Sequence, residues 1–203
     1  MPSTITAKLI DAMKRTTERI DDFFETNRAI FGDTDPSPYG YMTFSSFLVV
    51  ASYSPGKEHF PNTSVDREEG DTEKFKSIIV QAITDSVLRR HAEAIELMRS
   101  EAEKAEHAAS ARQRVETFVD GKYAEYFRYF QLDIEELAEG KSLYKNLSTA
   151  FMRDVLARKE SDPSPGQPAA DNVSFGLCLS TTISGLLSFF EKTDSQAVPK
   201  MGE

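Results

Sequence analysis

Apolar residues in the first part of this chain recur at helical intervals. Within residues 4–31 they follow one another at steps of four or seven, which places them on one helix face: Ile5, Leu9, Met13, Ile20, Phe24 and Phe31. Ser3 or Thr4 is a suitable N-cap, and Gly32 stands where a helix-ending glycine is expected. The pattern predicts a first helix over residues 4–31.

A second apolar stretch, residues 42–53, carries no charge and is rich in β-branched and aromatic side chains. It is short enough to form either a helix or a strand. We favour a buried helix, because no second strand-like segment lies nearby to pair with it. The flanking residues 32–41 and 54–71 contain proline and glycine and are predicted loops, the second long enough to suggest a mobile or functional segment.

The most prominent predicted element is one unusually long helix, over about residues 72–119, where the sequence has neither proline nor glycine. Part of it follows a heptad pattern that suggests an interface, formed by Leu88, His91, Ile95, Met98, Ala102 and Ala105. A straight helix of about 45 residues would be roughly 70 Å long, too long for a bundle of this size. We therefore expect it either to bend near residues 108–110 or to project and meet a partner.

After Asp120 and Gly121, two more helices are predicted, over residues 122–139 and 142–159. The first has a core face of Tyr123, Phe127, Phe130, Ile134 and Leu137, with Tyr126 beside it. These rings suggest core packing, with an aromatic ligand cavity as the alternative. Tyr129 lies off this face, so we expect it to be exposed and count it as a candidate interface residue. The second helix has a stripe of Leu143, Leu147, Ala150, Phe151 and Val155.

The C-terminal part suggests a division of the chain into a helical domain (1–160), a proline-rich linker (161–172), an apolar helix (173–190) and a disordered tail (191–203). The apolar helix is long enough to approach a membrane span. Its serine, threonine and glycine content and the lack of flanking cationic clusters favour packing on the bundle instead. The predicted fold is an all-α bundle of about five or six helices.

Composition narrows the possible partners and the compartment. The net charge of −9, from 33 acidic against 24 basic residues, disfavours nucleic acid and anionic lipid as partners. The single cysteine, Cys178, cannot form an internal disulfide, which is typical of a reducing compartment. The first residues lack the pattern of a secretory signal. We therefore expect a cytoplasmic protein.

The sequence contains no phosphate-binding loop, nucleophile elbow or zinc motif, so we assign no catalytic, cofactor-binding or metal-binding residue. His91 and His107 are sixteen residues apart on the predicted long helix, too far to bind one ion together. The favoured function is non-catalytic: contact with a protein partner or with a second copy, as a structural or adaptor subunit. The alternatives are membrane association through Val173–Phe190 and small-ligand binding by a helical bundle.

Overall fold

The computed structural model describes residues 4–31, 36–53, 69–98, 100–140, 143–156 and 170–197, and every regular element in these ranges is a helix. The predicted all-α fold class is confirmed. The helical segments are α1 (Thr4–Thr26), α2 (Arg28–Phe31), α3 (Pro38–Tyr53), α4 (Glu69–Arg90), α5 (Ala92–Glu96), α6 (Glu101–Ala138), α7 (Lys145–Asp154) and α8 (Ala170–Ala197). Most of the predicted 54–71 loop and of the 161–172 linker lies outside the described residues.

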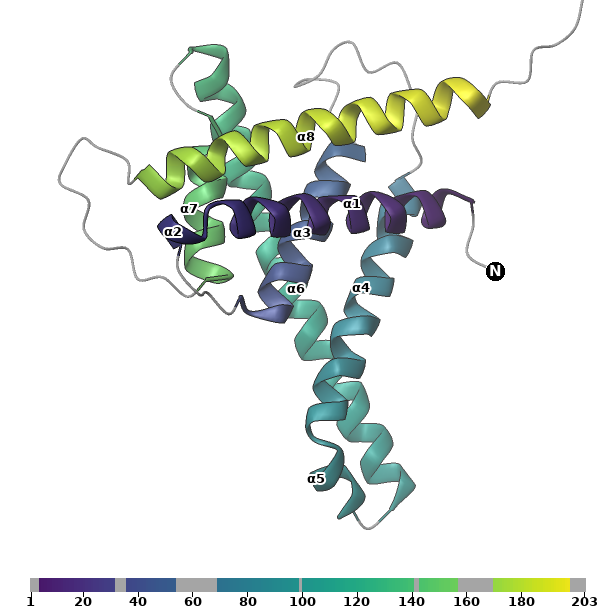
Figure 1. Cartoon of the computed structure of the whole chain (residues 1–203). Helices are drawn as coiled ribbons and strands as arrows, with labels where there is room; N and C mark the ends of the chain where they lie inside the picture. The colour runs from purple at the N-terminus through teal and green to yellow at the C-terminus, as the bar shows by residue number, and fades with distance from the viewer. Residues whose placement is uncertain are drawn as a thin grey trace, which may run out of the picture.

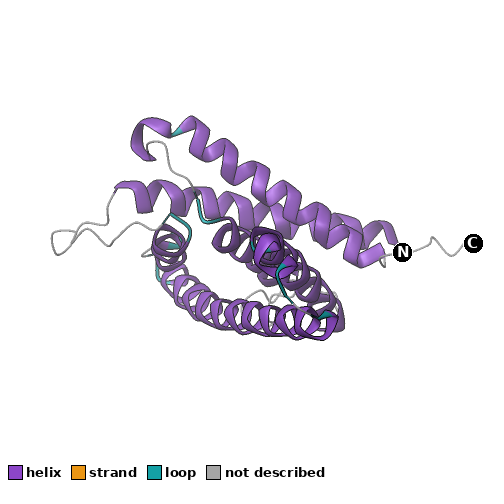
Figure 2. Cartoon of the chain, turned by 90° about the horizontal axis from the view of Figure 1, so that it is seen from below, coloured by secondary structure: helices purple, strands orange, loops and turns teal. Residues whose placement is uncertain are grey.

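Helix α3 is the centre of the bundle and contacts α1, α4, α6 and α8. Its residues Phe44–Val49 are all buried, so the preference for a buried helix over 42–53 is confirmed. The helix begins at Pro38, inside the predicted 32–41 loop, because Ser37 caps it by accepting a hydrogen bond from the Gly40 amide (3.3 Å) and proline fits the first helical position. Helices α1 and α8 lie side by side and cross α3, while the antiparallel hairpin of α4 and α6 extends away from them to the tip at α5 (Figures 1 and 2).

Aromatic rings join the helices around Phe151 of α7, which is fully buried. Its ring centroid lies 4.4 Å from that of Phe175 in α8 and 4.9 Å from that of Phe44 in α3. The Phe24 ring of α1 stacks on Phe151 at 5.7 Å, and Phe44 contacts Tyr126 of α6 edge-on at 5.1 Å. Five helices therefore meet in one aromatic core.

The prediction of a single helix over residues 72–119 is wrong. The chain leaves α4 at Arg90, forms the short α5 and starts α6 at Glu101. Ser100 and Glu103 form a capping box, in which the Ser100 hydroxyl accepts from the Glu103 amide and the Glu103 carboxylate accepts from the Ser100 amide, both at 3.2 Å. The chain thus reverses direction before α6. Of the two alternatives for the long helix, a bend near residues 108–110 does not occur, because these residues lie inside α6.

The predicted helix boundary at Gly121 is also wrong, since α6 runs through this residue to Ala138 and is 38 residues long. This continuity fixes the helical phase, so the buried residues are Ala111, Val115, Val119, Tyr126, Phe130 and Asp133. Phe127, predicted to be in the core, is 42% exposed. Tyr129, predicted to be exposed, is half-buried, and its hydroxyl lies 3.4 Å from a Glu125 carboxylate oxygen.

Helix α7 is shorter than the predicted 142–159 helix, and its first turn is capped by a side chain of α6. The buried Asp133 carboxylate of α6 accepts from the backbone amides of Asn146 (2.8 Å) and Leu147 (2.9 Å), and from the Asn146 side chain (2.9 Å). Tyr144 precedes the helix with φ of 48°, and Leu143 is left 40% exposed instead of joining the predicted stripe. Burial raises the pKa of Asp133 although these hydrogen bonds favour its charged form.

The apolar stripe predicted for residues 173–190 is confirmed, since Phe175, Leu179, Ile183, Leu186 and Phe190 are all at most 4% exposed. Helix α8 packs on α1, α3 and α7 and continues to Ala197, so residues 191–197 are helical and not part of a disordered tail. Among the described residues, Val173–Lys192 is the one stretch that is long and apolar enough to cross a membrane, and 44% of it is buried. A core helix of a soluble protein has the same properties.

Candidate functional site

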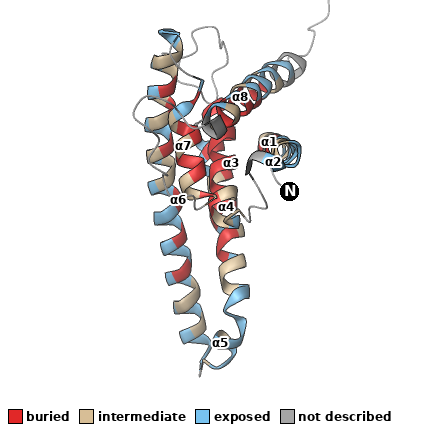
Figure 3. Ribbon diagram, turned by 60° about the vertical axis from the view of Figure 1, so that its left-hand side comes forward, coloured by how far each residue is buried: buried red, intermediate tan, exposed pale blue. Residues whose placement is uncertain are grey.

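The α4–α6 hairpin extends beyond the bundle as an arm, which we define as residues 85–110. Thr84 is the last buried residue of α4 and Ala111 is the first buried residue of α6. None of the described residues between them is buried. Figure 3 shows that the buried positions end well before the tip of the hairpin, where α5 lies. The arm is therefore a surface element that contributes little to the core.

Six of the seven candidate interface residues lie on this arm, but not along one helix face. Leu88 is in α4 and Ile95 in α5, while Ala102 and Ala105 are in α6, so the heptad repeat is interrupted by the turn. Leu88, Ile95 and Met98 are half-buried, whereas His91, Ala102 and Ala105 are exposed. Beside them, the sequence pattern missed Leu97, which is 84% exposed at the tip. The seventh candidate, Tyr129, lies on α6 outside the arm.

Polar contacts between α4 and α6 hold the base of the arm. The Arg112 guanidinium donates to the Gln81 side-chain oxygen at 2.9 Å, and Gln81 in turn donates to Asp85 at 2.8 Å. Nearer the bundle, the Lys76 ammonium lies 3.1 Å from an Asp120 carboxylate oxygen. The Arg112–Gln81 and Lys76–Asp120 contacts join α4 to α6 across residues far apart in the sequence.

A cavity of about 570 Å³ lies at the base of the arm, between the start of α3 and the facing sides of α4 and α6. Its lining is Ser37, Tyr39, Ile83, Val87, His91, His107, Ala111, Arg114, Val115 and Phe118. The hairpin brings His91 and His107 to the same cavity, although a continuous helix would keep them far apart. This cavity is not the aromatic ligand cavity considered for residues 122–139. None of those residues lines it, and Tyr126 and Phe130 are packed in the core.

The basic side chains at this cavity lack acidic partners among the described residues. Arg114 donates from Nε to the Ser110 carbonyl of its own helix at 3.3 Å and forms no ion pair there. Beside the cavity, the Arg90 guanidinium lies over the Tyr39 ring, 5.0 Å from its centroid. The Tyr39 hydroxyl is buried and has no hydrogen-bond partner within the described part of the chain. The cavity therefore combines apolar walls with arginines that have no acidic partner within the described residues.

A group of four charged residues links α6 to α7 and is electrically balanced. Asp154 accepts from Lys122 at 2.8 Å and from Arg153 at 2.7 Å, and Glu125 lies 2.9 Å from Lys122 and 2.6 Å from Arg153. Burial works against the Asp154 charge, but the hydrogen bonds from Arg153 and Lys122 outweigh it and hold its pKa below the usual value. Because each charge has an opposite partner, this group stabilises the contact between two helices.

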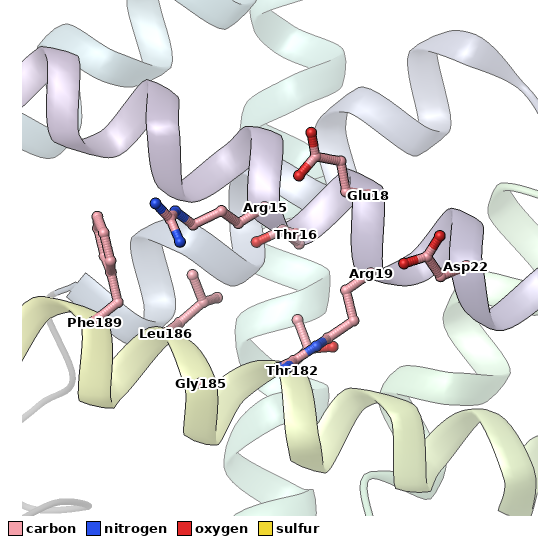
Figure 4. A pocket seen from close by; sticks show the side chains of 9 residues that line it. All are labelled: Arg15, Thr16, Glu18, Arg19, Asp22, Thr182, Gly185, Leu186 and Phe189. Atoms are coloured by element: carbon pink, nitrogen blue, oxygen red, sulfur yellow. The ribbon is translucent and has the colours of Figure 1, made fainter.

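A smaller cavity, about 300 Å³, lies between α1 and α8 (Figure 4). Arg19 crosses it and donates to the Thr181 carbonyl at 2.7 Å, while Arg15 lies over the Phe189 ring at 5.1 Å and pairs with Asp11. Glu18 and Asp22 also line it, so its charges are mixed. Its basic and acidic side chains therefore serve mainly to join the two helices.

Comparison with protein-family models, curated proteins and solved structures gives no match for this chain. The arm and the cavity at its base are therefore the features of the molecule from which we infer its function. No group of three or more His, Cys, Asp or Glu side chains suited to a metal ion occurs within the described residues.

Proposed function

We propose that the protein acts through protein–protein contact, with the arm as its binding element. One observation supports this most directly: residues 85–110 include no buried position among those described, yet the tip carries Ile95, Leu97 and Met98. A segment that adds little to the core and carries three apolar side chains within four residues at its end is suited to burial against a partner. The partner is another protein or a second copy of this chain.

Photo-crosslinking from the tip tests this proposal. A photoreactive phenylalanine analogue at Leu97 should give discrete cross-linked species in cells, and the added change Ile95→Asp should abolish them by placing a charge in the apolar contact. Since Ile95 is outside the core, this variant should keep the circular dichroism spectrum and melting temperature of the parent.

The matched control places the same analogue at Phe127, which is also exposed but lies on α6 beyond the arm. It should give no such species. Cross-links from Phe127 equal to those from Leu97, or none from Leu97, would remove the support for the arm as the binding element.

Membrane association through α8 is a second candidate, because Val173 and Leu177 are 46% and 49% exposed on a helix of sufficient length and apolar composition. Against it, the buried stripe of α8 would have to leave the core before it could meet lipid. Sedimentation of the full chain with vesicles tests this candidate, and we expect the chain to stay in the supernatant.

A further inference from the structure

The cavity at the base of the arm has the size and the walls of a small-molecule site. Its volume of about 570 Å³ falls within the range of roughly 300–1,000 Å³ typical of ligand pockets. Three separate elements build it, with Tyr39 from α3, Ile83 and Val87 from α4, and Val115 and Phe118 from α6. Such walls favour an apolar ligand body over a purely polar one.

The polar groups around the cavity are all neutral or basic. His91, His107 and Arg114 line it together with Ser37, and no acidic side chain does, although the chain carries 33 acidic against 24 basic residues. Among the described residues, Arg114 forms no ion pair, and the adjacent Arg90 lies over the Tyr39 ring. An arginine in this setting favours a carboxylate or another oxyanion.

We propose that this cavity binds an anionic amphiphile, a molecule with an apolar tail and a carboxylate head. The tail lies against the aliphatic and aromatic walls from α4 and α6, and the head pairs with Arg114, which is exposed to solvent. This site is separate from the tip of the arm, so it does not depend on the arm having a protein partner.

The chain contains no tryptophan, which allows a direct fluorescence test. Phe118→Trp places a single tryptophan in the cavity wall. Phe127→Trp is the matched control, since Phe127 belongs to the same helix and is equally exposed (42% against 41%) but does not line the cavity. Because both positions are partly exposed, both variants should keep the parent's melting temperature.

Titration with decanoate below its micelle concentration should change the emission of the Phe118→Trp variant saturably, with one ligand per chain, and leave the Phe127→Trp variant unchanged. Adding Arg114→Gln should weaken binding about tenfold or more, as expected for loss of a charged hydrogen bond. Arg128→Gln, an exposed α6 change outside the cavity, should leave the affinity unaltered. Decanol, which has the same tail without the charge, should bind at least about tenfold more weakly.

Four results would overturn the proposal. A Phe118→Trp variant that does not respond to decanoate would show that the cavity takes no such ligand. Equal responses from the two tryptophan variants would show non-specific adsorption. Equal affinities for decanoate and decanol, or an affinity unaffected by Arg114→Gln, would show that the basic side chains recognise no anionic head.

Discussion

Gly176 lies where helix α8 approaches the backbone before α7 too closely for any side chain larger than hydrogen. A side chain at this position would collide with the backbone oxygen of Leu143, just before α7. Gly185, further along the same helix, faces only the end of the Arg19 side chain, and a methyl carbon added there would lie 2.6 Å from a guanidinium nitrogen. The two glycines lie on one helix but have different neighbours. Gly176 faces fixed backbone, whereas Gly185 faces a side chain that can move.

Gly176→Ala should lower the free energy of unfolding by about 1–3 kcal/mol, because the backbone before α7 must shift to admit the methyl group. Gly185→Ala is the control, and we expect a change within about 0.5 kcal/mol, since the arginine can move away and alanine favours the helix. Chemical denaturation of both variants measures this difference. Equal effects would mean that α7 and α8 do not approach each other at Gly176.

At the scale of single elements, the continuity of α6 has a simple test. Gly121 is exposed in the middle of this helix, with nothing within 4 Å of the position that a side chain would occupy. Gly121→Ala should therefore raise the free energy of unfolding by about 0.4–1 kcal/mol, since alanine reduces the freedom of the unfolded chain. A loss of stability would indicate that the chain turns at Gly121, as the sequence alone suggests.

The contact between α6 and α7 should depend on pH through Asp154. Its pKa is lowered in the folded state, so the ionised carboxyl favours folding. The stabilisation is present above the ordinary carboxyl pKa of about 4 and is lost as the pH falls through the lowered folded value. Wild type should therefore be more stable than Asp154→Asn near neutral pH, and the difference should shrink in acid. A difference that does not change with pH would exclude this electrostatic contribution.

The helices that sequence analysis predicted well are those with one uninterrupted apolar stripe. In α8, the residues from Phe175 to Phe190 at helical spacing are all in the core, because a single face meets α1, α3 and α7. In α6, by contrast, a helix predicted to start after Gly121 can have a core face unrelated to that of the preceding residues. That prediction wrongly placed Phe127 in the core. Packing of Val119 and Tyr126 on the same face overrides the cost of one glycine.

The reversal of the chain between α4 and α6 is partly predictable from the sequence. Ser100 and Glu103 have the spacing of a capping box, a helix-start signal that the absence of proline and glycine obscured. The cavity was not readable, because His91 and His107 meet there only after the chain has turned back. The heptad spacing groups the candidate residues of the arm on one helix, and only the tertiary structure shows that they lie on separate helices.

At the scale of the whole molecule, both proposals depend on the hairpin. The arm exists because α4 and α6 run antiparallel beyond the core, and the cavity exists because their facing sides meet the start of α3. A continuous helix over residues 72–119 would remove the cavity and change the shape of the arm. The distance between a residue on α4 and a residue on α6 distinguishes the hairpin from the continuous helix.

Gln81 and Arg112 are suitable positions, because they are exposed and their side chains are hydrogen-bonded at 2.9 Å across the hairpin, 31 residues apart in sequence. Spin labels at both positions, in a Cys178→Ala background and diluted with unlabelled chain, report their separation by electron paramagnetic resonance. Neighbouring helices lie about 8–10 Å apart, so we expect strong short-range dipolar broadening. One continuous helix would instead separate the labelled backbone positions by about 46 Å, and a distance of that order would contradict the account.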